Sequence, residues 1–272
     1  MKKLIFIVLT LITISSYATN SNIIKDNGKF KKILIVVAMQ NTADPIINHF
    51  HLTQDHVLPA NLPMLSYKGK YKNLDLYLIE NGIDPVTKVP NVGTQASVLT
   101  TYLGIEHYHP DIIITAGTGG GYVRNGTKIG DIYLSKKIYY YDRRIPIKKY
   151  LSYSEGGYEL FDTNQIAKTL HLKTGNICSG DSFIDEKDKT DNKIISQLNC
   201  QVVDMISAGV AWVGEITNTP TFAIKGITDR IDSPVNESTQ FKKNVQLVVE
   251  KLPTVLQATL DQLIKTEGSW KA

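Results

Sequence analysis

Short aliphatic runs alternate along the chain with segments whose apolar residues recur at a helical spacing. Residues 33–37 form a continuous aliphatic run, which is typical of a strand buried on both faces of a sheet. Similar runs predict further strands at residues 74–79, 111–115, 131–134, 201–205 and 221–224. The spacing predicts helices at residues 91–106, 207–216 and 241–264. This alternation predicts an α/β fold, with a mixed, mostly parallel sheet flanked by helices.

The rest of the chain adds no second domain to this picture. No stretch rich in proline and glycine divides it, so we expect one domain over residues 31–272. An apolar content of 42% and a charged content of 21% are those of an ordinary globular protein. The Lys- and Tyr-rich residues 136–153 are expected to form a solvated loop or flap.

The first eighteen residues have the pattern of a cleavable signal peptide. Lys2 and Lys3 precede an apolar run at residues 4–14, and small residues at Ser16 and Ala18 fit a signal peptidase site. The run is too short for a bilayer span of roughly 20 residues. We therefore expect export to the periplasm or the extracellular space, an N-terminal extension at residues 19–30, and no membrane association after cleavage.

Charge and histidine content exclude several classes of partner. Removal of Lys2 and Lys3 lowers the formal net charge from +4 to +2, which is too small to indicate a nucleic-acid partner. The six histidines form no cluster with the spacing of metal ligands, and the chain has no dinucleotide-binding fingerprint. We expect no metal and no organic cofactor.

Two cysteines, Cys178 and Cys200, allow two interpretations. An exported protein meets an oxidising compartment, in which the pair can close into a disulfide. Simple burial of both thiols is the alternative. Their spacing matches no zinc-binding pattern.

Distinctive residues follow the predicted strands, at the edge where ligands bind in open α/β sheets. Residues 117–121 contain four glycines and Thr118, and we expect a turn there. It is either a purely structural turn or one whose backbone amides approach a ligand closely. It is not a phosphate-binding loop of the Walker type. Other polar strand ends lie at residues 38–42, 179–183, 204–206 and 228–229.

Taken together, these motifs resemble one family. The matching pieces, in order, are Ile-Val-Val-Ala-Met-Gln at 35–40, Pro-Asp-Ile-Ile-Ile at 110–114 leading into Ala-Gly-Thr at 116–118, Ile-Gly-Asp at 129–131, Asp-Arg-Arg-Ile-Pro-Ile at 142–147, Ser-Gly-Asp-Ser at 179–182, Asp-Met at 204–205 and Thr-Asp at 228–229. The chain resembles the 5′-methylthioadenosine/S-adenosylhomocysteine nucleosidases of the nucleoside phosphorylase superfamily, particularly the plant-type branch. The resemblance implies a single-domain α/β/α sandwich, a purine nucleoside ligand, and a homodimer whose second subunit closes the sugar end of the pocket.

The resemblance also implies roles for particular residues. Asp229 matches the catalytic Asp that contacts a purine ring nitrogen and helps the base leave, although an Asp that caps a helix is the alternative interpretation. Phe183 matches the aromatic residue that stacks on the purine, and burial in the core is the alternative interpretation. Met205 matches the methionine beside the sugar and base. Further implied ligand contacts are Met39, Thr118, Gly119, Ile184, Ile206 and Thr228.

Two positions depart from the family pattern. Thr42 stands where the resemblance places the general base for water, and a threonine hydroxyl is too weak a base at neutral pH. Ile206 stands where it places the glutamate that holds the ribose hydroxyls, and isoleucine cannot accept a hydrogen bond. Asp44 is a candidate replacement base if the turn is reshaped.

Three functions are consistent with this pattern. The first is an exported purine nucleosidase-like protein whose N-ribosyl hydrolysis is impaired by Thr42 and Ile206. The alternative is a non-catalytic protein that binds a purine or nucleoside on the same fold. The third is a phosphate-dependent nucleoside phosphorylase, for which Arg143 and Arg144 could supply a phosphate site.

Overall fold

The computed structural model describes residues 30–265. The predicted signal peptide and residues 19–29 of the predicted extension lie outside the described residues. Within the described part, no helix is both long enough and apolar enough to cross a membrane.

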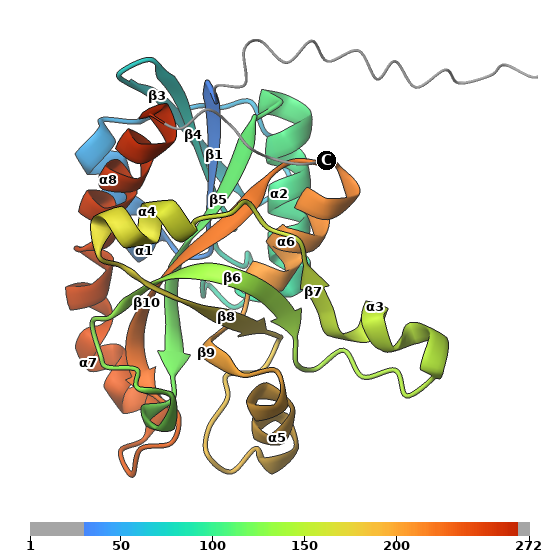
Figure 1. Cartoon of the computed structure of the whole chain (residues 1–272). Coiled ribbons are helices and arrows are strands. Elements are labelled where there is room, and N and C mark those ends of the chain that lie inside the picture. The colour runs from blue at the N-terminus through green and yellow to red at the C-terminus, as the bar shows by residue number, and fades with distance from the viewer. Residues whose placement is uncertain (1–29, 266–272) are drawn as a thin grey trace, which may run out of the picture.

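A mixed β-sheet forms the centre of the molecule (Figure 1). Its strands are β1 (Lys32–Val37), β2 (Thr53–Gln54), β3 (Leu65–Tyr71), β4 (Leu74–Glu80), β5 (Ile112–Gly121), β6 (Ile132–Tyr140), β7 (Gly156–Tyr158), β8 (Lys173–Ser179), β9 (Cys200–Asp204) and β10 (Thr221–Arg230). The central strands β4, β1, β5 and β10 pair in parallel. Antiparallel pairs join β3 to β4 and β6 to β10.

The sheet closes on itself over half of its width. Its order is β10-β6-β8-β9-β5-β1-β4-β3-β2, and β10 also pairs with β5. Strands β5, β10, β6, β8 and β9 therefore form a ring, whereas β1 to β4 extend from it as an open sheet. This ring brings the ends of β5, β8, β9 and β10 close together.

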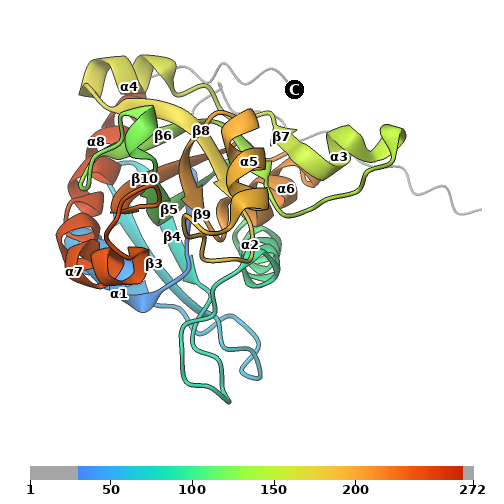
Figure 2. The ribbon, with the colours of Figure 1, turned by 90° about the horizontal axis from the view of Figure 1, so that it is seen from below.

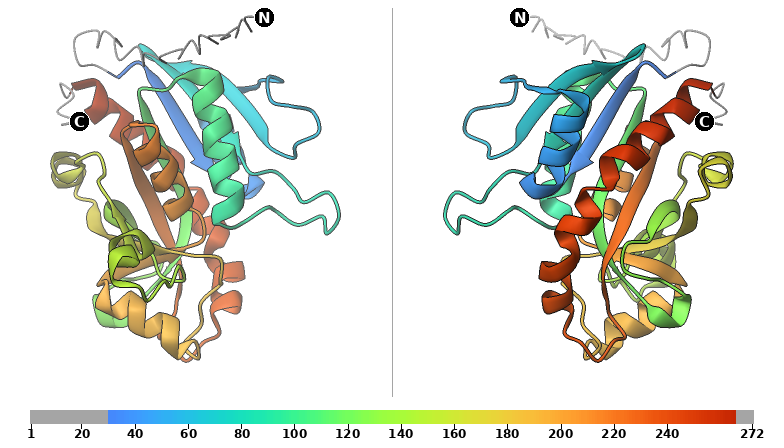
Figure 3. Two further views of the ribbon diagram at one scale, coloured as in Figure 1. Left: turned by 90° about the vertical axis from the view of Figure 1, so that its right-hand side faces the viewer. Right: turned by 90° about the vertical axis from the view of Figure 1, so that its left-hand side faces the viewer.

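Helices cover both faces of the open half, as Figures 1 and 3 show. The α-helices are α1 (Gln40–Phe50), α2 (Thr94–Tyr108), α3 (Leu151–Glu155), α4 (Asn164–Leu170), α5 (Lys189–Gln197), α6 (Ser207–Ile216), α7 (Glu237–Val249) and α8 (Leu252–Lys265). Helices α1 and α8 bury Ile46, Phe50 and Leu260 against one face. Helices α2 and α6 cover the other face with Ile105 and Val210.

Two predicted elements differ from the structure. The predicted turn at residues 117–121 is instead the end of β5, because these residues pair with β10 and with β9. The single helix predicted at residues 241–264 is two helices. Pro253 lies in the first turn of α8, where its ring would collide with the carbonyl of Val249 in a continuous helix, so α7 ends at Val249.

The segment predicted as a loop or flap begins as a strand. Strand β6 continues to Tyr140, and the following residues form short turns and α3, which projects from the body of the molecule (Figure 2). The guanidinium of Arg143 stacks between Tyr140 and Tyr153, at 4.0 and 4.2 Å from the ring centroids. These contacts fix the base of the projecting segment to β6.

A disulfide joins Cys178 of β8 to Cys200 of β9, with 5.7 Å between the two Cα atoms. The two strands are neighbours in the ring, and both lead directly into the polar strand ends described below.

Candidate functional site

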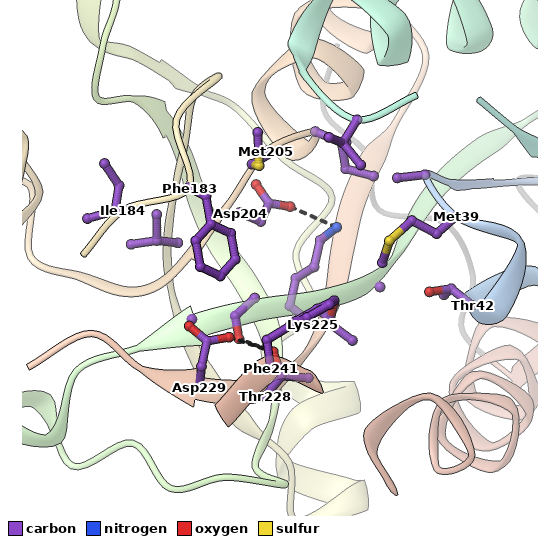
Figure 4. Close-up of a pocket in the computed structure, with 18 of the residues that line it drawn as sticks. Met39, Thr42, Phe183, Ile184, Asp204, Met205, Lys225, Thr228, Asp229 and Phe241 are labelled. Carbon is purple, nitrogen blue, oxygen red and sulfur yellow. Dashed lines mark hydrogen bonds and ion pairs between the residues drawn. The ribbon is translucent and has the colours of Figure 1, made fainter. Parts of the chain in front are cut away.

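A cavity of about 230 Å³ opens at the carboxyl ends of the ring strands (Figure 4). Residues from the loop after β1, from β5, from the loop after β8, from the end of β9, from β10 and from α7 line it. The closure of the ring thus assembles one site from segments that are far apart in the sequence.

All nine residues that the sequence analysis assigned to the site line this cavity. They are Met39, Thr118, Gly119, Phe183, Ile184, Met205, Ile206, Thr228 and Asp229. The structure therefore shows that these residues lie in one cavity, whereas the role of each in ligand binding or catalysis stays a prediction.

Asp229 is a buried carboxyl group near the end of β10. Its side chain is 3% exposed, and the Thr228 hydroxyl donates a hydrogen bond of 2.7 Å to its Oδ1 (Figure 4). Burial raises the pKa of Asp229 to about 6; the charge of Glu237 adds to this effect, and the Thr228 hydrogen bond opposes it. The alternative of a helix cap does not hold, since Asp229 lies within a strand and Asn236 caps α7.

Gly120 makes room for this carboxyl group. A β-carbon at Gly120 would lie 2.7 Å from Asp229 Oδ2 and 3.1 Å from the Ile231 side chain. Only glycine is compatible with the observed position of Asp229, so one of the glycines in β5 shapes the site.

Aromatic rings stand beside Asp229. Phe183, from the loop after β8, is 51% exposed, and its ring meets that of Phe241 edge to face with centroids 6.2 Å apart. A ring at the rim of a cavity is available to stack on a planar ligand. Phe241, from α7, was not predicted.

Thr42 lies on the opposite side of the cavity from Asp229 (Figure 4). It belongs to the first turn of α1 and is 1% exposed. Asp44 does not line the cavity: two residues further along α1 it is rotated by about 200° and is exposed to solvent. The structure therefore does not support Asp44 as a base acting on a ligand in this cavity.

Ile206 is buried just before α6 and presents no acceptor to a ligand. Within the described residues, Asp204 and Asp229 are the only carboxylates that line the cavity. Asp204 Oδ2 accepts hydrogen bonds from the Ser207 hydroxyl at 2.5 Å and from the Lys225 ammonium at 2.8 Å. Its carboxylate is thus committed to protein partners.

Lys225 is a second lining residue, besides Phe241, that the sequence analysis missed. It lies in β10, is 1% exposed and lines the cavity. A lysine between the apolar residues 222–224 and Ile227 is the signal that could have identified it, because a buried charge needs a partner. That partner, Asp204, is brought to it by the ring and not by a local motif.

Arg143 and Arg144 do not line the cavity. Arg143 donates to the Tyr158 hydroxyl at 2.9 Å in addition to its ring contacts, and Arg144 forms an ion pair with Asp191. Neither guanidinium is placed to bind phosphate in this site. In the described part of the chain, no group of three or more His, Cys, Asp or Glu side chains could hold a metal ion.

Comparisons with known proteins agree with this architecture. Residues 32–263 match the sequence model of the Phosphorylase superfamily. A 5′-methylthioadenosine/S-adenosylhomocysteine nucleosidase from Arabidopsis thaliana is 36% identical over 84% of this chain and 90% of the relative. A 5′-methylthioadenosine nucleosidase from the same organism is 34% identical over 81% of this chain and 82% of the relative.

The fold is shared with a solved structure at similar identity. The apo structure of Arabidopsis thaliana 5′-methylthioadenosine nucleosidase superimposes with a TM-score of 0.85 and 31% sequence identity. The match covers 89% of this chain and 99% of that structure. The predicted fold is confirmed, and the chain belongs to the phosphorylase superfamily and, within it, to the 5′-methylthioadenosine/S-adenosylhomocysteine nucleosidases.

Proposed function

We propose that the chain is an exported purine nucleosidase-like protein for nucleosides of the 5′-methylthioadenosine and S-adenosylhomocysteine type, with impaired N-ribosyl hydrolysis. The names of its relatives indicate the substrate class. The observation that carries the proposal is the buried Asp229 in the cavity, whose raised pKa lets it donate a proton or a hydrogen bond to a ring nitrogen of the base. The half-exposed Phe183 ring, which meets Phe241 edge to face, supports stacking on the purine as part of this proposal.

Impairment follows from the chemistry at the other end of the cavity. Cleavage of an N-ribosyl bond builds positive charge on the sugar, so carboxylates near it would stabilise the transition state. Thr42, on the side opposite Asp229, and Ile206, elsewhere in the described lining, are not carboxylates, while Asp204 is paired with Lys225. Among the described lining residues on this side, none is a free carboxylate that could act as the general base, whose assistance is typically worth about 10² to 10⁴ in rate.

A non-catalytic purine-binding protein is the second candidate, and the same observation favours it. Asp229 and Phe183 suffice to recognise a base, and Ile206 forms an apolar wall. Phosphorolysis is not favoured, since Arg143 and Arg144 are engaged elsewhere.

Export and dimerisation are further proposals. The disulfide between Cys178 and Cys200 is consistent with an oxidising compartment, as the predicted signal peptide requires. Exposed apolar side chains on α2 and on the loop before it support a homodimer; they are Ile83, Val86, Val89, Val92, Leu99 and Tyr102. Val92 also lines the cavity, so a second subunit packed on this surface would adjoin the site.

The test is release of free base from 5′-methylthioadenosine, S-adenosylhomocysteine and adenosine, measured with and without phosphate, beside calorimetric binding of adenine. Slow release that is independent of phosphate supports an impaired nucleosidase. Adenine binding without release supports the binding protein, and absence of both contradicts a purine site.

A further inference from the structure

The ammonium group of Lys225 has more protons than protein acceptors. An ammonium carries three N–H donors. The Lys225 nitrogen lies 2.8 Å from Asp204 Oδ2 and 3.3 Å from the Thr115 hydroxyl, and no third acceptor contacts it within residues 30–265. Because a buried donor without an acceptor is unfavourable, the remaining proton is available to a ligand in the cavity.

The cavity leaves access to this group. Gly117 lines the cavity next to it, and a β-carbon there would stand 3.5 Å from the Lys225 nitrogen. The Ile206 side chain also lines the cavity, and it offers a ligand no hydrogen-bond acceptor. Figure 4 shows the ammonium group displaced from Asp229 toward Met39 and Thr42. A purine that contacts Asp229 with its five-membered ring and extends across the cavity would direct its N9 substituent toward Lys225.

We propose that Lys225 is a specificity-determining residue that donates a hydrogen bond to an oxygen acceptor on the N9 substituent of the bound purine. This inference rests on the proposed function, because Lys225 can contact the N9 substituent only if Asp229 holds the purine in the cavity. The ligand class is a purine whose N9 group presents an acceptor oxygen beside an apolar surface. The ligand need not carry a pair of hydroxyl groups, because Ile206 offers no acceptor for their hydrogen bonds.

The partner Asp204 sets the charge of this contact. Its carboxylate neutralises the ammonium, so the pair presents a strong donor with little net charge. A neutral carbonyl should therefore benefit as well as a carboxylate, whereas a hydrocarbon of the same shape should not. This difference separates recognition of an acceptor from general attraction of anions.

Three adenine derivatives test the proposal by calorimetric titration of the mature protein: 9-(2-carboxyethyl)adenine, 9-(2-carbamoylethyl)adenine and 9-(3-methylbutyl)adenine. The groups have similar branched shapes and differ in their acceptor oxygens. The carboxylate and the amide should bind roughly tenfold or more tightly than the alkyl compound. Equal affinity of all three overturns the proposal, while an advantage of the carboxylate alone overturns the neutral-donor part of it.

The variant Lys225→Met/Asp204→Asn removes both charges together, so that neither is left buried alone. It should bind the three compounds with similar affinity and still bind adenine. Lys243→Met, at an exposed lysine of α7, is the matched control and should keep the native preference. An acceptor preference that persists in the double variant overturns the role of Lys225. If native protein fails to bind adenine, the proposed function itself fails; if it binds adenine without any acceptor preference, only this inference fails.

Discussion

The Lys225 nitrogen lies 2.8 Å from a carboxylate oxygen of Asp204, and the two side chains are 1% and 2% exposed. The pair links β10 to the end of β9, two strands of the ring that do not pair with each other. It therefore holds together the part of the cavity between Asp229 and Thr42.

Breaking this ion pair from one side should be costly. Lys225→Met leaves a buried carboxylate without its cation and should lower the free energy of unfolding by about 3–5 kcal/mol. Lys225→Met/Asp204→Leu removes both charges and should recover most of that loss. Urea denaturation of the two variants measures the difference; equal destabilisation of both would show that packing, and not charge, governs this region.

The free energy of unfolding should depend on pH through the titration of Glu80. Burial raises its pKa from 4.5 to about 7; the charge of Asp44 adds to the shift, and the Tyr67 hydroxyl opposes it. The folded state therefore binds the Glu80 proton up to a higher pH than the unfolded chain does. The corresponding stability, about 3 kcal/mol, is fully present below pH 4.5 and is lost as the pH rises through about 7.

The variant Glu80→Gln should flatten this dependence and be more stable than native protein at pH 8. Glu106→Gln, at an exposed position of α2, is the control and should leave the profile unchanged. Thermal unfolding between pH 4 and 8 measures both. Identical profiles for native protein and Glu80→Gln would show that Glu80 does not titrate differently in the fold.

Carboxylates at the two departing positions should raise hydrolysis. Thr42→Glu combined with Ile206→Glu adds a base and an acceptor for hydroxyls to the lining of the cavity, the base on the side opposite Asp229. We expect base release from 5′-methylthioadenosine to increase by about 10² or more if the ligand lies as in the relatives. No increase in a variant that still binds adenine would contradict that ligand orientation.

The sequence predicted six of the ten described strands, because continuous aliphatic runs such as residues 33–37 match buried strands directly. Strands β2, β3, β7 and β8 have no such run and were not predicted. It failed where tertiary pairing decides the outcome. The glycines of β5 were predicted to form a turn, but pairing with β10 keeps them in an extended strand. Asp229 was recognised from a local motif, whereas Lys225 was not, because its partner lies 21 positions away and is reached only through the closed ring.

Adenine binding should weaken as the pH rises through about 6. Below that value the Asp229 carboxyl group is protonated and can donate to a ring nitrogen; above it the group is an acceptor only. Calorimetry between pH 5 and 8 measures the effect. Constant affinity over this range would show that proton donation by Asp229 does not support binding.

The most direct test of the purine site is the affinity of Asp229→Asn for adenine, compared with native protein at pH 5.5. We expect a loss of about tenfold or more, since an amide cannot transfer a proton to the base as a neutral carboxyl group can. Circular dichroism of the variant confirms that it is folded. Unchanged adenine affinity in a folded Asp229→Asn protein would contradict the placement of the purine in this cavity.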